Sequence, residues 1–376
     1  MNHPRPKLKV LAFAPLYLPF LGGIEVLLGN ILPLLKARGI ETAVVCESAE
    51  GLPEREVMNG ITVHRLPLSA AVRARNAVEP LRVVQALKAI IAEEKPDLLH
   101  MHSVAQAASF YVDRILSQAG QSLPVYVSLH GALEAEDQLQ VVLNLLRRAN
   151  AVSGVSNACL ESAAAFLLPG APTRLIYNGI PATDLLCEPW RQGEVAQLLC
   201  VGRLQLEKGY DLAIRALGLL SARGLPARLR IIGRGVERQR FEALARDLGL
   251  ASQVEFLGEH PPAEVRQHMA RSHALLAPSR MREGFGLVVA EAAWMGVPAI
   301  VSDAGGLPEV ALDGRTGHVF PREDHNRLAD AIGLAFSSGN HWLKLSAQAR
   351  EHVRARFRLD DCVNGYIKFY QDFAGH

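Results

Sequence analysis

The stretch EGFGLVVAE, residues 283–291, carries a carboxylate at each end of a glycine-rich, apolar segment. Glu283 precedes an expected helix, and Glu291 lies well inside it. The start of a helix offers backbone N–H groups that need acceptors, and Gly284 and Gly286 leave this backbone accessible. Hydroxyls or a phosphate of a ligand would serve, and Glu283 could accept hydrogen bonds from sugar hydroxyls. A charge on so apolar a helix needs a partner, unless Glu291 lies on an exposed stripe and Glu283 merely favours the helix N-terminus.

Two cations occupy the loop VGRLQLEKGYD, residues 201–211, which follows an expected strand and opens a helix. Arg203 and Lys208 lie between Gly202 and Gly209. A diphosphate at a helix start gains from free N–H groups and from cations that pair with its oxygens. The loop therefore indicates an anion site, with an ordinary solvated loop as the alternative.

Two further glycine junctions are weaker signals. In IIGRGVER, residues 231–238, the third glycine of a dinucleotide-binding fingerprint is replaced by Arg238. In PFLGGIEVLLG, residues 19–29, Gly22 and Gly23 allow backbone N–H groups to face a ligand, or simply form a tight turn. Neither junction has the full G-x-G-x-x-G pattern that an NAD-dependent oxidoreductase requires.

Short apolar runs alternate with helical patterns, which is typical of parallel α/β architecture with strands buried on both faces. Expected strands are 9–15, 41–47, 97–103, 124–131, 150–156, 173–179, 196–204, 227–235, 253–259, 274–279 and 298–303. Expected helices include 23–38, 79–95, 209–223, 236–248, 262–271 and 286–296. The pattern breaks at 180–195, a linker with two prolines and a glycine. We expect two doubly wound domains that form a cleft at the carboxyl ends of their strands, and an apolar-striped C-terminal helix.

The composition narrows the function classes. The chain has 376 residues, 49% of them hydrophobic, and a formal net charge of +2. This length favours two domains, and the balanced charge argues against a nucleic-acid partner. Five scattered cysteines indicate a reducing compartment and no disulfide frame. No apolar run reaches the roughly 18 residues of a membrane span, and the N-terminal run is interpreted as a buried strand, so we expect a soluble, cytoplasmic protein.

Histidines and acidic residues lie near the ends of several expected strands. His100 and His102 share a face of a strand end, but no cysteine or carboxylate with ligand spacing accompanies them, so no metal site is predicted. Acidic residues that follow His130 suit either a role in catalysis or a solvated helix start, and they are Glu134, Glu136 and Asp137.

A helical stretch of the first domain carries several basic residues, namely Arg73, Arg75, Arg82 and Lys88. Such a stretch could dock on anionic lipid, which would suit a lipid-linked acceptor. A solvated helix face is the favoured alternative, because acidic and basic residues are about balanced in this domain.

The motifs together resemble the family 4 retaining glycosyltransferases of the GT-B fold. The resemblance is carried by YNGI, GRLQLEKG, IIGRG, FLGEH and APSRMREGFGLVVAEAAWMGVPAIVSDAGGLPEV, which span residues 177–310. In the first domain it rests more loosely on GGIE, HMHS and SLHG. The family's usual NG-aliphatic-D is here NGIP, and we expect Pro181 to alter the interdomain turn more than the chemistry.

The resemblance implies roles for individual residues. Arg203 and Lys208 resemble the pair that binds the donor diphosphate. Glu283 and Glu291 resemble the two glutamates of the E-x7-E motif, of which the first contacts the transferred sugar and the second contacts the ribose. His130 resembles the histidine near the reacting sugar. Residues implied in donor binding through backbone or pocket walls are Gly23, Gly233, Arg234, Leu257, Gly258, Phe285, Gly286 and Leu287.

The implied domains are an acceptor-binding domain over 1–185, a donor-binding domain over 186–356, and a C-terminal helix over 357–376 that packs back on the first domain. The implied activity is retaining, metal-independent transfer of a sugar, with no cofactor, from a UDP- or GDP-sugar to a hydroxyl of a glycan or lipid-linked acceptor. Cell-envelope or polysaccharide synthesis would be its setting, with peripheral contact at the inner face of the membrane left open. The chain contains no D-x-D that would hold a metal–diphosphate complex. A nucleotide-sugar epimerase, an oxidoreductase and a non-catalytic nucleotide-sugar binder remain alternatives.

Overall fold

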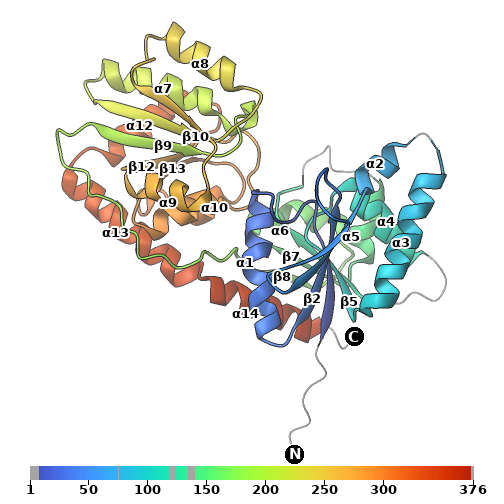
Figure 1. The fold of residues 1–376 in the computed structure, drawn as a ribbon. Helices are drawn as coiled ribbons and strands as arrows, with labels where there is room; N and C mark the ends of the chain where they lie inside the picture. Colours follow the sequence, from blue (N-terminus) through green and yellow to red (C-terminus); the bar gives the residue numbers. More distant parts are fainter. Residues whose placement is uncertain (1–7, 75, 118–122, 134–139, 374–376) are drawn as a thin grey trace, which may run out of the picture. The chain divides into compact units, whose positions relative to one another are not determined.

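The computed structural model describes residues 8–74, 76–117, 123–133 and 140–373. Arg75, Glu134, Glu136 and Asp137 lie outside these residues. The chain divides into two compact units (Figure 1). Unit 1 comprises Met1–Gly179 and Leu359–His376, and unit 2 comprises Ile180–Arg358. Each unit is an α/β structure around its own sheet, so the α/β class predicted from the alternating pattern is confirmed.

Unit 1 contains an eight-stranded sheet in the order β3-β4-β2-β1-β5-β6-β7-β8. The strands are β1 (Lys9–Phe13), β2 (Glu41–Glu47), β3 (Arg55–Met58), β4 (Ile61–Leu66), β5 (Leu98–Met101), β6 (Val125–Leu129), β7 (Ala151–Gly154) and β8 (Thr173–Leu175). All neighbours are parallel except β3 and β4. Because strand order reverses between β1 and β5, the loops that follow these strands diverge at a topological switch point.

The helices of unit 1 supply the apolar faces that cover this sheet. They are α1 (Gly23–Ala37), α2 (Leu68–Arg73), α3 (Val78–Glu94), α4 (Gln106–Leu116), α5 (Gln140–Arg148), α6 (Asn157–Ala163), the 3-10 turn η2 (Ala164–Phe166) and α14 (Leu359–Phe373). Helix α14 lies beside α1 (Figure 1) and buries Val363, Tyr366 and Phe369 in the core of unit 1. The C-terminal segment is therefore part of the first unit.

Unit 2 contains six strands, all parallel, in the order β11-β10-β9-β12-β13-β14. They are β9 (Ala196–Val201), β10 (Ala227–Ile232), β11 (Val254–Gly258), β12 (Ala274–Ala277), β13 (Ala299–Ser302) and β14 (Gly317–Phe320). Numbered along the chain, this order is 3-2-1-4-5-6, that of dinucleotide-binding folds, with its switch point between β9 and β12.

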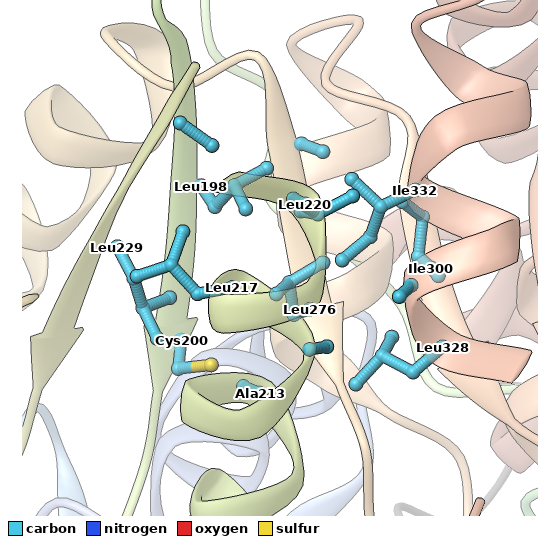
Figure 2. Packing of buried hydrophobic residues seen from close by; sticks show 14 of the residues in the cluster. Leu198, Cys200, Ala213, Leu217, Leu220, Leu229, Leu276, Ile300, Leu328 and Ile332 are labelled. Carbon is cyan, nitrogen blue, oxygen red and sulfur yellow. The ribbon is translucent and has the colours of Figure 1, made fainter. Parts of the chain in front are cut away.

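The helices of unit 2 are η3 (Leu206–Lys208), α7 (Tyr210–Ala222), α8 (Arg238–Asp247), α9 (Pro262–Ala270), α10 (Leu287–Trp294), α11 (Leu307–Val310), α12 (His325–Ala335) and α13 (Gly339–Arg356). Figure 2 shows how Leu217 and Leu220 of α7 pack with strand residues and with Leu328 and Ile332 of α12. This buried cluster makes the strand ends a rigid support for the loops that follow them.

Some expectations differ from the structure. The strand at 173–179 was expected to be buried on both faces, but β8 is an edge strand of three residues, of which Thr173 is exposed and Arg174 and Leu175 are half-buried. The hairpin β3–β4 was not predicted, although it turns at Asn59 and Gly60 with φ of 50° and 78°. Asn-Gly is the pair that favours such a two-residue turn.

The stretch 180–195 has no helix or strand, as a linker should. Among the described helices, none combines the length and apolar character needed to cross a membrane.

Candidate functional site

Two loops of unit 2 leave the sheet at its switch point. The loop after β9 contains Arg203 and η3, and the loop after β12 leads through Glu283 into α10. Strands β9 and β12 are neighbours, while the chain continues from β9 to β10 on one side and from β12 to β13 on the other. Open parallel sheets bind ligands at such a point. The two motifs singled out in the sequence are thus placed at the same edge of the same sheet.

An ion pair joins the two loops. Lys208 Nζ donates to Glu283 Oε1 at 2.6 Å, and the hydroxyl of Ser279 donates to the same oxygen at 2.8 Å. The two charged side chains retain 23% and 19% exposure. Because both donors contact Oε1, Glu283 keeps the acceptor capacity of its second oxygen. The structure therefore brings Lys208 and Glu283, which are 75 residues apart in sequence, into one ion pair.

Arg280 holds the turn that carries Lys208. Its guanidinium donates to both carboxylate oxygens of Asp211 at 2.7 and 2.8 Å and to the carbonyl of Leu206 at 2.7 Å. Its backbone N–H donates to the carbonyl of Glu207 at 2.7 Å. Burial alone would raise the pKa of Asp211, but the hydrogen bonds from Arg280 outweigh it and lower that pKa. Bidentate arginine–carboxylate pairs are geometrically specific, so together these contacts hold η3 and the first turn of α7 against the β12 loop.

Glycines permit the close approach of these loops. Gly209 has φ of 68°, and a Cβ there would lie 1.9 Å from the carbonyl oxygen of Pro278. Gly233 has φ of 139°, and its Cβ would lie 1.9 Å from the carbonyl oxygen of Gly202. Any side chain at either position would force the backbones apart. The glycines of the sequence motifs are required by packing between loops, whether or not a ligand also approaches them.

Helix α10 begins without a side-chain cap. Gly286 is its N-cap, with φ of 98°, and the first helical residue is Leu287. The Phe285 side chain is buried edge-on against Phe357 with ring centroids 5.0 Å apart, so only its backbone can serve a ligand. The first N–H groups of a helix have no partner inside it, and the dipole favours an anion there.

Glu291 lies in the second turn of α10. Burial raises its pKa to about 7, and Arg266 acts against this shift. Within the described part of the chain, the carboxyl has no hydrogen-bond partner, although a partner was expected for a charge on so apolar a helix. A carboxylate with a raised pKa and no internal partner is well suited to accept hydrogen bonds from the hydroxyl groups of a ligand.

The remaining residues predicted in unit 2 surround the same edge. Arg203 is exposed and forms no ion pair with any described residue. The N–H of Gly233 donates to the carbonyl of Gly258 at 2.7 Å, which brings the ends of β10 and β11 together. Leu257 is half-buried on β11. The Arg234 side chain is 82% exposed and is paired with Glu259 at 3.0 Å.

Gly23 and His130 belong to unit 1. Gly23 is the exposed first residue of α1. His130 follows β6 and lines a cavity of about 230 Å³ together with Ile24, Ser103, Val104, Leu129, Gly131, Ala132 and Leu133. Burial lowers the pKa of His130 to about 4, so the imidazole is neutral near pH 7. Nowhere in the described ranges do three His, Cys, Asp or Glu side chains gather in a way that could hold a metal ion.

Three residues that contact the site were not singled out from the sequence, namely Asp211, Ser279 and Arg280. Ser279 and Arg280 lie in the APSRMREGFG stretch directly before Glu283. A buried serine and an arginine at the end of a strand were the available signal. Their partners come from the β9 loop and the first turn of α7, about 70 residues earlier in the chain, so only the fold identifies the contacts.

Two family models match this chain. A family described as glycosyl transferases group 1 matches residues 190–352, and one described as Glycosyltransferase Family 4 matches residues 21–184. A GDP-mannose-dependent alpha-(1-6)-phosphatidylinositol monomannoside mannosyltransferase from Mycobacterium tuberculosis is 30% identical over 63% of this chain and 66% of its own. A D-inositol 3-phosphate glycosyltransferase from Acidothermus cellulolyticus is 27% identical over 93% of this chain and 86% of its own.

Two solved structures illustrate the shared fold. A sucrose-phosphate synthase from Thermosynechococcus elongatus superimposes with a TM-score of 0.83 at 21% identity, covering 98% of this chain and all of that one. Anabaena HepE in complex with UDP-glucose superimposes with a TM-score of 0.78 at 20% identity, covering 97% of this chain and all of that one.

Proposed function

Because the chain belongs to the family 4 glycosyltransferases, we propose that it transfers a sugar from a nucleotide-diphosphate sugar to an acceptor hydroxyl with retention of the anomeric configuration. Its fold is the GT-B fold that the sequence motifs predicted. The observation that carries the proposal is the Lys208–Glu283 ion pair at the switch point of the unit 2 sheet.

The cations of the β9 loop are assigned to the diphosphate. Arg203 is exposed without an ion-pair partner among the described residues, and Lys208 is half-buried. As the sugar leaves, negative charge develops on the diphosphate, and fixed cations that stabilise this charge lower the barrier. Arg280 is positioned to keep Lys208 in place during this step, because it binds the backbone on the N-terminal side of Lys208.

The two carboxylates are assigned to hydroxyl groups. Glu283 would accept hydrogen bonds from hydroxyls of the transferred sugar through its second oxygen, and Glu291 from the ribose. The backbone N–H groups of Phe285, Gly286 and Leu287 would hold sugar hydroxyls or the distal phosphate. Gly233, Arg234, Leu257 and Gly258 would line the nucleoside pocket, and Gly23 and His130 would contribute from unit 1.

In the proposed reaction, the bond between the anomeric carbon and the phosphate oxygen breaks, and its electrons remain on the diphosphate. The acceptor oxygen bonds to the anomeric carbon on the same face, and its proton passes to the departing phosphate oxygen. Charge stabilisation comes from Arg203, Lys208 and the start of α10, so we propose that neither a metal nor a cofactor is needed.

The donor is proposed to be a UDP- or GDP-sugar. One relative is named for GDP-mannose, and one solved structure holds UDP-glucose, which supports testing both bases. The acceptor is proposed to be a glycan or lipid-linked intermediate of cell-envelope or polysaccharide synthesis. The epimerase, oxidoreductase and binding-protein alternatives have no observation in their favour.

We propose a cytoplasmic location with peripheral membrane contact through α2 and α3. Val78 and Leu81 are 53% and 52% exposed, and Arg73 and Arg82 lie close by in sequence. Arg82 is also paired with Glu79 at 2.7 Å, which reduces the charge available to a lipid surface. Sedimentation with anionic and neutral vesicles would test this part of the proposal.

The experiment that tests the function has two steps. A thermal-shift screen over UDP-, GDP- and ADP-sugars should reveal a preferred donor, because a ligand that binds only the folded state raises Tm. The preferred donor is then incubated with candidate hydroxyl acceptors, and the anomeric configuration of the product is read by NMR. No shift with any nucleotide sugar, or an inverted product, would contradict the proposal.

A further inference from the structure

Three histidines are packed side by side at the carboxyl ends of β5 and β6. His100 and His102 are fully buried on and just after β5, with ring centroids 3.9 Å apart. His130 follows β6, and its Nε2 lies 3.2 Å from Nδ1 of His102. All three belong to unit 1. The mechanism proposed above uses His130 but neither of the other two.

His100 is saturated by other partners. Its Nδ1 contacts the Tyr370 hydroxyl at 2.7 Å, and its Nε2 contacts the Ser128 hydroxyl at 2.8 Å. Both ring nitrogens are therefore engaged: Nδ1 links β5 to α14, and Nε2 links β5 to the neighbouring strand β6. His102 and His130 have only each other as hydrogen-bond partners within the described part of the unit.

The direction of the His102–His130 hydrogen bond follows from the other nitrogen of His102. Its Nε2 is buried and has no hydrogen-bond partner in the described structure. If Nε2 carried the proton, a buried N–H donor would be left unsatisfied, which proteins almost never tolerate. If Nδ1 carries it, the donor is satisfied by His130 Nε2, and only an acceptor lone pair is left over. The arrangement with Nδ1–H as donor is the less costly one.

We propose that His102 is a positioning residue that donates from Nδ1–H to His130 Nε2 and so fixes His130 as the tautomer with its proton on Nδ1. The inference rests on the proposed function for its catalytic meaning. Fixed in this way, His130 lines the 230 Å³ cavity as a neutral hydrogen-bond donor toward an oxygen atom of a bound substrate.

Burial lowers the pKa of both histidines, which supports a neutral pair. A neutral imidazole has one donor and one acceptor nitrogen, and the hydrogen bond made by one nitrogen decides the role of the other. Without His102, either nitrogen of His130 could carry the proton. The share of molecules with the competent tautomer, and with it the apparent activity, would fall accordingly.

The first test is made on the wild-type protein without substrate. Protein labelled with 15N-histidine is studied by long-range 1H–15N correlation at pH 7.5, and the His130 ring is assigned by its loss in His130→Gln. The expected pattern is protonated Nδ1 and unprotonated Nε2 at His130, with protonated Nδ1 at His102. Protonated Nε2 at His130 would overturn the inference without any variant of His102.

Two variants complete the test. His102→Asn places an amide N–H close to the position of Nδ1 and should keep the His130 tautomer, whereas His102→Leu should give a mixture. With the preferred donor, His102→Leu should lose about two- to tenfold in kcat/KM because the competent fraction drops, and His102→Asn should recover most of it. An unchanged tautomer in His102→Leu would overturn the inference. Absence of transferase activity in wild type would instead count against the proposed function and leave the tautomer result standing.

Discussion

Replacing Glu291 by glutamine is expected to stabilise the ligand-free protein above neutral pH while weakening donor binding. The carboxyl is set into the second turn of α10, and burial raises its pKa from 4.5 to about 7. The fold therefore favours the neutral acid, and ionisation of the group costs stability. A side chain of the same size that never ionises avoids this cost.

The magnitude follows from the two pKa values. Below pH 4.5 the carboxyl of Glu291 is protonated in both the folded and the unfolded chain, so it does not lower the free energy of unfolding. As pH rises from 4.5 to about 7, the unfolded chain ionises while the folded protein stays protonated, so wild type loses stability relative to the glutamine variant. Above about pH 7 both states are ionised, and the difference levels off. Between pH 5 and pH 8 this difference in the free energy of unfolding should grow by about 2–3 kcal/mol. For a unit of this size, that corresponds to about 5–10 °C in Tm.

The assay is thermal unfolding of the full chain at pH 5 to 8, for wild type and Glu291→Gln. Glu351→Gln is the matched control, since it removes a glutamate that is exposed on α13 of the same unit. The control should show a much smaller change with pH, because that side chain is in water in both states. A Tm difference that stays constant from pH 5 to 8 would refute the argument from burial.

The affinity for the donor should change in the opposite direction to the stability, because ionisation of Glu291 destabilises the fold but favours donor binding. If Glu291 accepts ribose hydroxyls, wild-type affinity should weaken below pH 7 as the carboxylate is protonated. Glu291→Gln should bind the donor about 10- to 100-fold more weakly at pH 8, the usual cost of a hydrogen bond to a charged group. Titration calorimetry at both pH values measures this. Equal affinity in the two proteins at pH 8 would remove Glu291 from the donor site, while the stability result could still stand.

Three further perturbations are expected to separate the roles of the loops. Lys208→Ala should lower kcat about 100-fold or more while the protein stays folded by circular dichroism, and wild-type turnover would exclude this lysine from the site. Arg280→Lys should lose the bidentate pairing with Asp211, with lower Tm and lower kcat. A lower Tm with an unchanged kcat would show that the pairing does not position Lys208. Gly233→Ala should lower Tm much more than Gly249→Ala, because both glycines have positive φ but only the former would meet another backbone. Similar losses in the two variants would contradict the packing argument.

Much of the fold could be predicted because local patterns determine it. The strands from 9–15 to 298–303 appear at the predicted places, since apolar runs and helical periodicity report burial directly. Strands β3, β4 and β14 and helices α4, α5, α6, α11, α12 and α13 were not specified in advance. The partial exposure of β8 also differs from the expected burial on both faces, because strand order in the sheet decides which strand lies at an edge.

The sequence by itself determined the two α/β units and the glycine loops. It also showed that one loop carries cations and another carries carboxylates. It also supplied the family resemblance, because the motifs lie in short contiguous stretches. Only the tertiary structure decided that Lys208 contacts Glu283, that Arg280 binds Asp211, and that His102 meets His130. These contacts join residues 28 to 75 positions apart, and the distance between such residues depends on strand order and loop direction. The tertiary structure also decided the burial that raises the pKa of Glu291, since desolvation depends on everything packed around a group and not on its neighbours in sequence.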